Sequence, residues 1–143
     1  MAGEIFPIES SCLSPEKEII NLCKEAIEYK FYSVCVNSCY VRLAKEFTRN
    51  SNVKVCSVIG FPLGAMSTKS KVFEAKQAVE DGAQEIDMVM NVGFLKSQNF
   101  LAVLKDIADV KNAIGKIPLK KRWIPTGLTL LFICLIYFWG ASQ

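Results

Sequence analysis

The chain has 143 residues, of which 51% are hydrophobic and 22% are charged, and its formal net charge is +3. These values predict one globular domain, or part of a larger one, and exclude intrinsic disorder as the default state. The small net charge, without an arginine-rich stripe, argues against nucleic acid as a partner. Histidine is absent from the sequence, which excludes a Ser-His-Asp triad, a Cys-His pair and any histidine-containing zinc site within it.

The cysteines predict free thiols. They show no CxxC spacing, and two of them fall in apolar, strand-like segments; the six are Cys12, Cys23, Cys35, Cys39, Cys56 and Cys134. This pattern favours buried thiols in a reducing compartment over a disulfide framework or a metal site. Residues 1–4 lack the basic-then-apolar form of a secretory signal, which predicts a cytoplasmic protein.

The N-terminal part predicts a helix, a strand and a second helix. Ser14 suits the N-cap of the first helix and Pro15 its first residue. Apolar residues at helical spacing then predict a buried helix face made of Ile19, Leu22, Cys23, Ala26 and Ile27. A strand is expected over residues 31–36 and a helix over residues 41–47, ending near Asn50.

The middle of the chain continues this alternation. We expect a strand over residues 53–60, a loop over 61–65 and a helix over 68–80 that stops at a glycine. A third strand is expected over residues 85–91, followed by an amphipathic helix over 100–110. This order predicts a parallel sheet with crossover helices, but it does not distinguish an open doubly wound sheet from a barrel.

One carboxylate, Asp87, interrupts the apolar run of the third strand. An ionised carboxylate in a buried strand costs several kcal/mol unless it is paired or hydrogen-bonded. Two interpretations remain open at this point, a catalytic group and a member of a specific buried network.

The tail differs from the rest of the chain. A basic cluster at residues 116–122 precedes 21 uncharged residues, 123–143. Their most apolar stretch, residues 128–139, is shorter than the ~20 residues that span a bilayer comfortably. The tail is therefore interpreted either as a marginal membrane anchor or as an aberrant end. We expect the chain to divide into residues 1–115 and a divergent tail, residues 116–143.

Several segments together resemble deoxyribose-phosphate aldolases. They follow that family's order over about residues 18–113 and comprise residues 33–41, 53–64, 71–76, 85–93 and 95–97. The resemblance implies an α/β fold, a TIM (β/α)8 barrel of which this chain holds about the first half. It also implies a class I aldolase, which converts 2-deoxy-D-ribose 5-phosphate to D-glyceraldehyde 3-phosphate and acetaldehyde, in deoxyribonucleotide and carbohydrate catabolism.

The family reaction runs through a lysine Schiff base without a metal or other cofactor. By the resemblance, Asp87 is the family's catalytic acid-base group and Cys35 lines the substrate pocket. Phe61, just beyond a strand, is a further candidate for the wall of that pocket. From the residues themselves, Cys35 is equally well a small buried hydrophobe and Phe61 a packing residue. The lysines at positions 54, 69, 71 and 76 are each interpreted as solvated surface residues.

The likeness fades near Ile117, where the family's fifth strand should begin, and Pro125 is unsuited to a central strand. The segments carrying the Schiff-base lysine, the second lysine and the phosphate loops are not recognisable. We therefore expect three barrel strands and no activity from this chain by itself.

Three hypotheses remain open from the sequence. The chain is an aldolase product cut short, or a non-catalytic derivative that is membrane-tethered or binds a partner, or a half-barrel completed by another chain. The expected partners are a small sugar phosphate and further copies of the chain in a homo-oligomer. A membrane is the less favoured partner, through the tail.

Overall fold

The computed structural model describes residues 16–122. Within them lies a four-stranded sheet in the order β1-β2-β3-β4, with every neighbouring pair parallel. The strands are β1 (Ser33–Asn37), β2 (Lys54–Ile59), β3 (Glu85–Val89) and β4 (Leu119–Arg122). Strand order that follows chain order, with a helix between successive strands, is the arrangement of a (β/α) barrel wall.

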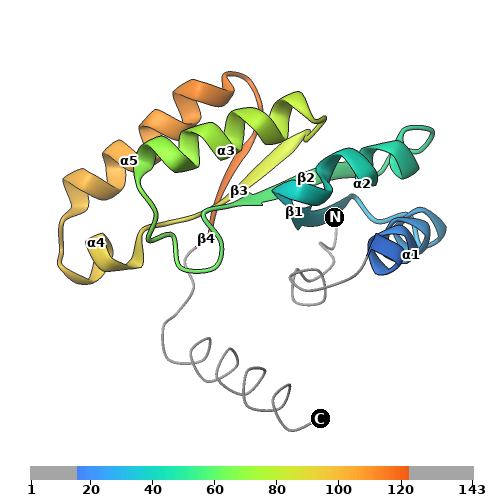
Figure 1. Ribbon diagram of the computed structural model, residues 1–143, viewed down its shortest axis with the longest axis horizontal. Helices are drawn as coiled ribbons and strands as arrows, with labels where there is room; N and C mark the ends of the chain where they lie inside the picture. Colours follow the sequence, from blue (N-terminus) through green and yellow to red (C-terminus); the bar gives the residue numbers. More distant parts are fainter. Residues whose placement is uncertain (1–15, 123–143) are drawn as a thin grey trace, which may run out of the picture.

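The helices lie on one face of this sheet, where their buried residues join a single apolar core with those of the strands (Figure 1). They are α1 (Glu16–Glu28), α2 (Val41–Thr48), α3 (Thr68–Glu80) and α5 (Phe100–Ile114), with the short η2 (Ser38–Tyr40) and α4 (Val92–Lys96) between elements. Helices α3 and α5 pack side by side above the sheet.

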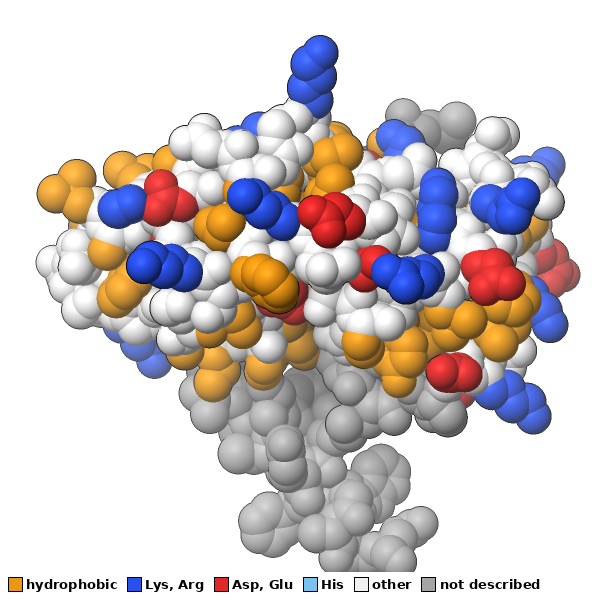
Figure 2. Space-filling model, turned by 45° about the horizontal axis from the view of Figure 1, so that its top comes forward, with side chains coloured by type: hydrophobic (Ala, Val, Ile, Leu, Met, Phe, Trp, Pro, Cys, Tyr) orange, Lys and Arg blue, Asp and Glu red, His pale blue; other side chains and the backbone are white. Residues whose placement is uncertain are grey.

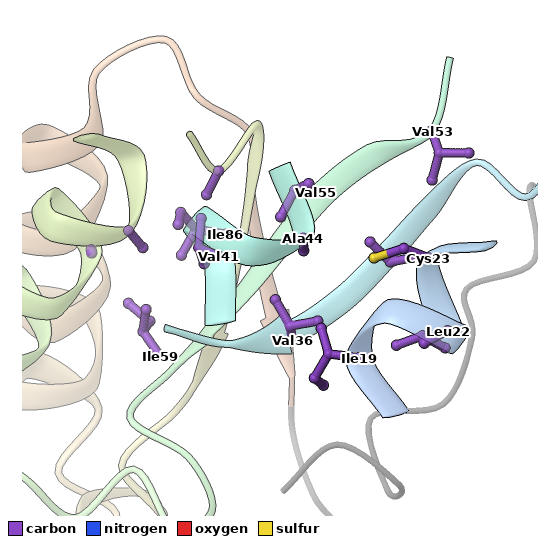
Figure 3. Packing of buried hydrophobic residues seen from close by; sticks show 14 of the residues in the cluster. Ile19, Leu22, Cys23, Val36, Val41, Ala44, Val53, Val55, Ile59 and Ile86 are labelled. Carbon is purple, nitrogen blue, oxygen red and sulfur yellow. The ribbon is translucent and has the colours of Figure 1, made fainter. Parts of the chain in front are cut away.

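The core between helices and sheet is apolar. Figure 3 shows Ile19 of α1 next to Val36 of β1. The strands contribute six buried residues to this core: Val34, Val36, Val55, Ile59, Ile86 and Met88. Because side chains alternate along a strand, these residues occupy every second position and leave the others for the opposite face.

The predicted elements agree with the structure at most positions. The helix expected over residues 68–80 is α3, with the same bounds. The third strand ends at Val89 and not at residue 91, because Asn91 is the N-cap of α4, its Oδ1 accepting from the Phe94 N–H at 3.1 Å. On α1, Ile27 is exposed, so the buried face is narrower than expected. Ser14 and Pro15 lie outside the described residues.

The expectation of three barrel strands was wrong, since β4 adds a fourth beyond residue 115. The Ile86 N–H donates to the Pro118 carbonyl at 3.0 Å, and Ile86 pairs with Leu119 in register. Parallel pairing uses backbone groups, so a change of side chains near Ile117 does not prevent it. The separate character of the tail stays a prediction for residues 123–143, which lie outside the described part of the chain.

The outer side of the helices carries basic and acidic side chains mixed together, without a patch of one sign in the view of Figure 2. Among the helices between residues 16 and 122, none is long and apolar enough to cross a membrane. The apolar stretch at residues 128–139 is not covered by that statement.

Candidate functional site

The face of the sheet away from the helices carries the charged and thiol side chains. Register places Cys35 beside Cys56 and Cys56 beside Glu85, and places Asp87 between Val58 and Lys120. We call this set the polar face: Cys35, Lys54, Cys56, Val58, Glu85, Asp87 and Lys120. In a barrel this face points to the interior, where the side chains of alternate strand positions meet.

Asp87 is the third residue of β3 and only 3% exposed. The pKa of the Cys56 thiol is raised mainly by its hydrogen bond to Cys35 and by burial, and the pKa of the Lys120 amine mainly by its hydrogen bond to Glu85; the negative charge of Asp87 adds to both increases. The carboxylate therefore interacts with both adjoining strands, β2 and β4. A buried carboxylate held among other titratable groups is the kind of group that proteins use for proton transfer.

Lys120 provides a positive charge next to two carboxylates. Its Nζ donates to Glu85 Oε2 at 2.7 Å, with the lysine side chain 34% exposed and the glutamate buried. Burial by itself lowers the pKa of Lys120, but the hydrogen bond to Glu85 and the charges of Cys56, Glu85 and Asp87 outweigh it and raise the pKa overall. Lys120 is therefore a protonated amine at neutral pH, which suits it to charge compensation and not to nucleophilic attack.

The two predicted pocket residues lie together. Cys35, Cys56 and Val58 form a small buried cluster against which Phe61 packs. The hydrogen bond between Cys56 and Cys35, followed by burial and the charge of Asp87, raises the pKa of the Cys56 thiol far above its usual range. The thiol stays protonated and acts as a small apolar group. Val58 connects this cluster to Asp87, its partner in register.

Lys54 lies at the start of β2, toward the other end of the polar face. Its Nζ donates to Tyr32 Oη at 2.5 Å and lies 4.5 Å from the centroid of the same ring. The hydrogen bond to Tyr32 raises the pKa of Lys54. This amine too is protonated at neutral pH.

The interpretation of Lys71 as a surface lysine was wrong. The side chain is fully buried, and its Nζ forms an ion pair with Asp106 Oδ2 at 2.5 Å. Lys69 and Lys76, on the same helix, are exposed as expected. The available signal was spacing, because Lys71 continues the buried stripe of Ala75 and Ala78 at positions i, i+4 and i+7.

Sequence reasoning also missed Glu85. Its two-residue spacing from Asp87 places both carboxylates on one face of β3, a period-two signal that was readable. Lys120 gave no such signal, because its role depends on β4 joining the sheet. Between residues 16 and 122, no group of three or more acidic or thiol side chains gathers into a metal site.

Comparison with known proteins places this geometry in a family. Residues 4–120 match the DeoC/LacD family aldolase model. The chain is 59% identical to the deoxyribose-phosphate aldolase of Finegoldia magna over 101 residues, 70% of this chain and 47% of that protein. It is 52% identical to the deoxyribose-phosphate aldolase of Clostridium kluyveri over 124 residues, 85% of this chain and 57% of that protein.

Solved structures agree. A deoxyribose-phosphate aldolase structure from Coccidioides immitis matches with a TM-score of 0.78 and 40% identity, over 84% of this chain and 47% of that one. The tetrameric deoxyribose phosphate aldolase of Aeropyrum pernix matches with a TM-score of 0.68 and 29% identity, over 82% and 49%. The chain spans about half the length of the curated relatives it matches. Its α/β fold is accordingly a partial TIM barrel, and the chain belongs to the DeoC/LacD aldolase family.

Proposed function

We propose that this chain carries the acid-base part of a deoxyribose-phosphate aldolase site, with Asp87 as the proton-transfer group. The observation that carries the proposal is a carboxylate buried in a barrel strand of an aldolase family member and surrounded by titratable side chains. The relatives' names supply the substrate class, a deoxyribose phosphate. In this reaction Asp87 moves a proton at the substrate, through water, while a lysine amine elsewhere forms the Schiff base.

Cys35 and Phe61 form one wall of the proposed pocket. Both lie in the small cluster that adjoins Asp87 through Val58. Because the Cys56 thiol stays protonated, this wall presents uncharged atoms to the substrate. Such a wall suits the deoxy part of the sugar, which has no hydroxyl to hydrogen-bond.

Three lysines that contact the sheet or lie on it, Lys54, Lys71 and Lys120, do not suit the nucleophile's role. A Schiff-base lysine needs a lowered pKa to be a free amine at neutral pH. Lys54 and Lys120 both have raised pKa values, and Lys71 is held in a buried ion pair. We therefore expect residues 16–122 to supply no Schiff base.

Borohydride trapping tests that expectation. The purified chain is incubated with 2-deoxyribose 5-phosphate and sodium borohydride, and adducts are located by mass spectrometry of peptides. We expect no stoichiometric adduct on any lysine. An adduct on Lys120 or Lys54 would contradict the argument from their raised pKa values.

A chimera tests Asp87. Residues 16–118 of this chain replace the matching segment of the Clostridium kluyveri relative, whose own remaining strands complete the barrel. In the chimera, Asp87→Asn should lower kcat by roughly 10²- to 10⁴-fold, the usual effect of losing a positioned acid-base group. Asp109→Asn is the matched control, because Asp109 lies on α5 in a surface ion pair with Lys105. Equal turnover of the two variants would remove Asp87 from the mechanism.

The cellular setting follows from the family proposal. We expect the complete protein to act in the cytoplasm on a sugar phosphate and to form oligomers, since the Aeropyrum pernix relative is tetrameric. No finding in residues 16–122 favours the membrane-tethered alternative.

A further inference from the structure

Helix α3 carries two oppositely charged residues, Lys71 and Glu74, which lie one turn apart and both reach the sheet. Charged side chains on a barrel helix usually face solvent. Here both instead contact the C-terminal ends of strands, the end at which barrel enzymes place their active sites. The proposed function of Asp87 uses neither residue.

Glu74 joins the ends of the first two strands. Its Oε1 accepts from Ser38 Oγ at 2.8 Å, and its Oε2 accepts from the Gly60 N–H at 2.9 Å. Ser38 directly follows β1, and Gly60 directly follows β2. The two oxygens of one carboxylate therefore connect neighbouring strand ends.

Lys71 joins the end of the third strand to two helices. Its Nζ donates to the carbonyl of Val89, the last residue of β3, at 3.2 Å. The same Nζ donates to Asp106 Oδ2 on α5 at 2.5 Å, with both side chains buried. The end of β3 is thus tied to α3 and α5 at one point.

The two side chains meet at Gly60. The φ angle of Gly60 is +68°, a conformation that favours glycine, and a Cβ there would lie 3.1 Å from Lys71 Cε. Glycine therefore provides both the backbone turn that donates to Glu74 and the space through which the Lys71 chain passes.

We propose that Lys71 and Glu74 are positioning residues, a rim brace that sets the spacing of the C-terminal ends of β1, β2 and β3. Val89 lies two residues after Asp87, and Gly60 immediately precedes Phe61. Through these neighbours the rim brace holds Asp87 and the pocket wall at a set distance. The inference rests on the proposed function of Asp87, and it names the residues that orient that group.

Variants of these residues can change the position of Asp87 without unfolding the protein. Replacing a buried ion pair by apolar residues of similar volume is often neutral or stabilising, whereas removing one partner leaves a buried charge unpaired. The double substitution Lys71→Met/Asp106→Leu should therefore fold while losing the tie to Val89. Glu74→Met keeps roughly the volume of the side chain and loses both acceptor contacts, to Ser38 and to Gly60.

The test uses the full 143-residue chain labelled with ¹³C, so that the Asp87 carboxyl signal can be followed by NMR. In both variants we expect the chemical shift of the Asp87 carboxyl carbon to change, together with that of the Val89 amide in the first variant and the Gly60 amide in the second. Melting temperatures are recorded in parallel. Lys76→Met on the exposed side of α3 is the control and should leave the Asp87 signal unchanged.

A role confined to stability would lower the melting temperature without moving the Asp87 signal. Unchanged Asp87 signals in the folded variants would overturn the rim brace. If the double variant does not fold, the Asp87 signal of Glu74→Met alone decides the question. The readout requires no turnover. If the Asp87→Asn chimera stays active, the proposed function of Asp87 is wrong, but the NMR experiment still shows whether Lys71 and Glu74 position Asp87.

Discussion

The two faces of the sheet are built by the same four strands, yet they differ in chemistry. The face toward the helices carries valine, isoleucine and methionine side chains in one apolar core. The polar face carries thiols, two carboxylates and two lysines at the strand positions that alternate with those apolar residues. Because a strand presents alternate residues to opposite sides, the apolar face can maintain the fold while the side chains of the polar face provide a functional site.

The charges on the polar face are tolerated because they compensate one another. Glu85 is paired with Lys120, and Asp87 lies beside the same lysine. A buried carboxylate without such a neighbour would cost several kcal/mol. The apolar face should therefore dominate stability, and the polar face should dominate pH dependence and chemistry.

The largest effect should come from the apolar face. Ile86→Ala removes a fully buried side chain at the centre of the sheet and should lower the free energy of unfolding by about 2–5 kcal/mol. Denaturant unfolding followed by circular dichroism measures it. Leu104→Ala on α5, where the side chain is 62% exposed, is the control and should cost less than about 0.5 kcal/mol. Equal losses would contradict the assignment of the core.

A smaller effect is expected on the polar face. Glu85→Gln removes the charge that pairs with Lys120 and should cost about 1–3 kcal/mol at neutral pH, a range limited by the partial exposure of the lysine. The pKa of Lys120 should fall toward its ordinary value, which NMR of the lysine Cε would show. An unchanged Lys120 pKa would show that Glu85 does not raise it.

The pH dependence of this pair has a defined sign. Because folding raises the pKa of Lys120 above 10.5, the stabilisation is complete below that pH and is lost as pH rises through the folded value. The stability difference between the wild type and Glu85→Gln should therefore shrink in the alkaline range. A difference that grows above pH 10.5 would contradict the ion pair.

A thiol on the apolar side should give a third effect. Burial raises the pKa of Cys23 from 9.0 to about 11, so the unfolded chain ionises first and stability falls between those pH values. The contribution of one group is at most about 1.4 kcal/mol per pH unit. Cys23→Ala should flatten the slope in this interval, measured by denaturant unfolding at several pH values. An unchanged slope would show that other groups cause it.

The smallest effect should come from the surface. Arg42 and Asp81 form an ion pair at 2.5 Å, but the arginine side chain is 81% exposed. Arg42→Ala should cost less than about 1 kcal/mol in the same unfolding assay, because water competes for the exposed guanidinium group. A loss as large as that of Ile86→Ala would remove the distinction between buried and exposed contacts.

Local patterns in the sequence determined the main elements of this protein. The helical spacing of apolar residues over 100–110 predicted α5, and the apolar run around Asp87 predicted β3 with a carboxylate inside it. Such periodicities are readable because neighbouring residues of one element share a face. The family resemblance added the expectation of a barrel.

Only the tertiary structure decided which charges meet. Lys71 and Asp106 are 35 residues apart, as are Glu85 and Lys120, and no local period connects either pair. Lys71 differs from Lys69 and Lys76 in its partners, which the packing of α3 on α5 and β3 supplies. Strand β4 likewise forms by backbone pairing with β3, and the side chains around Ile117 do not predict this pairing. Contacts between distant segments depend on how the elements assemble, and local sequence carries little information about them.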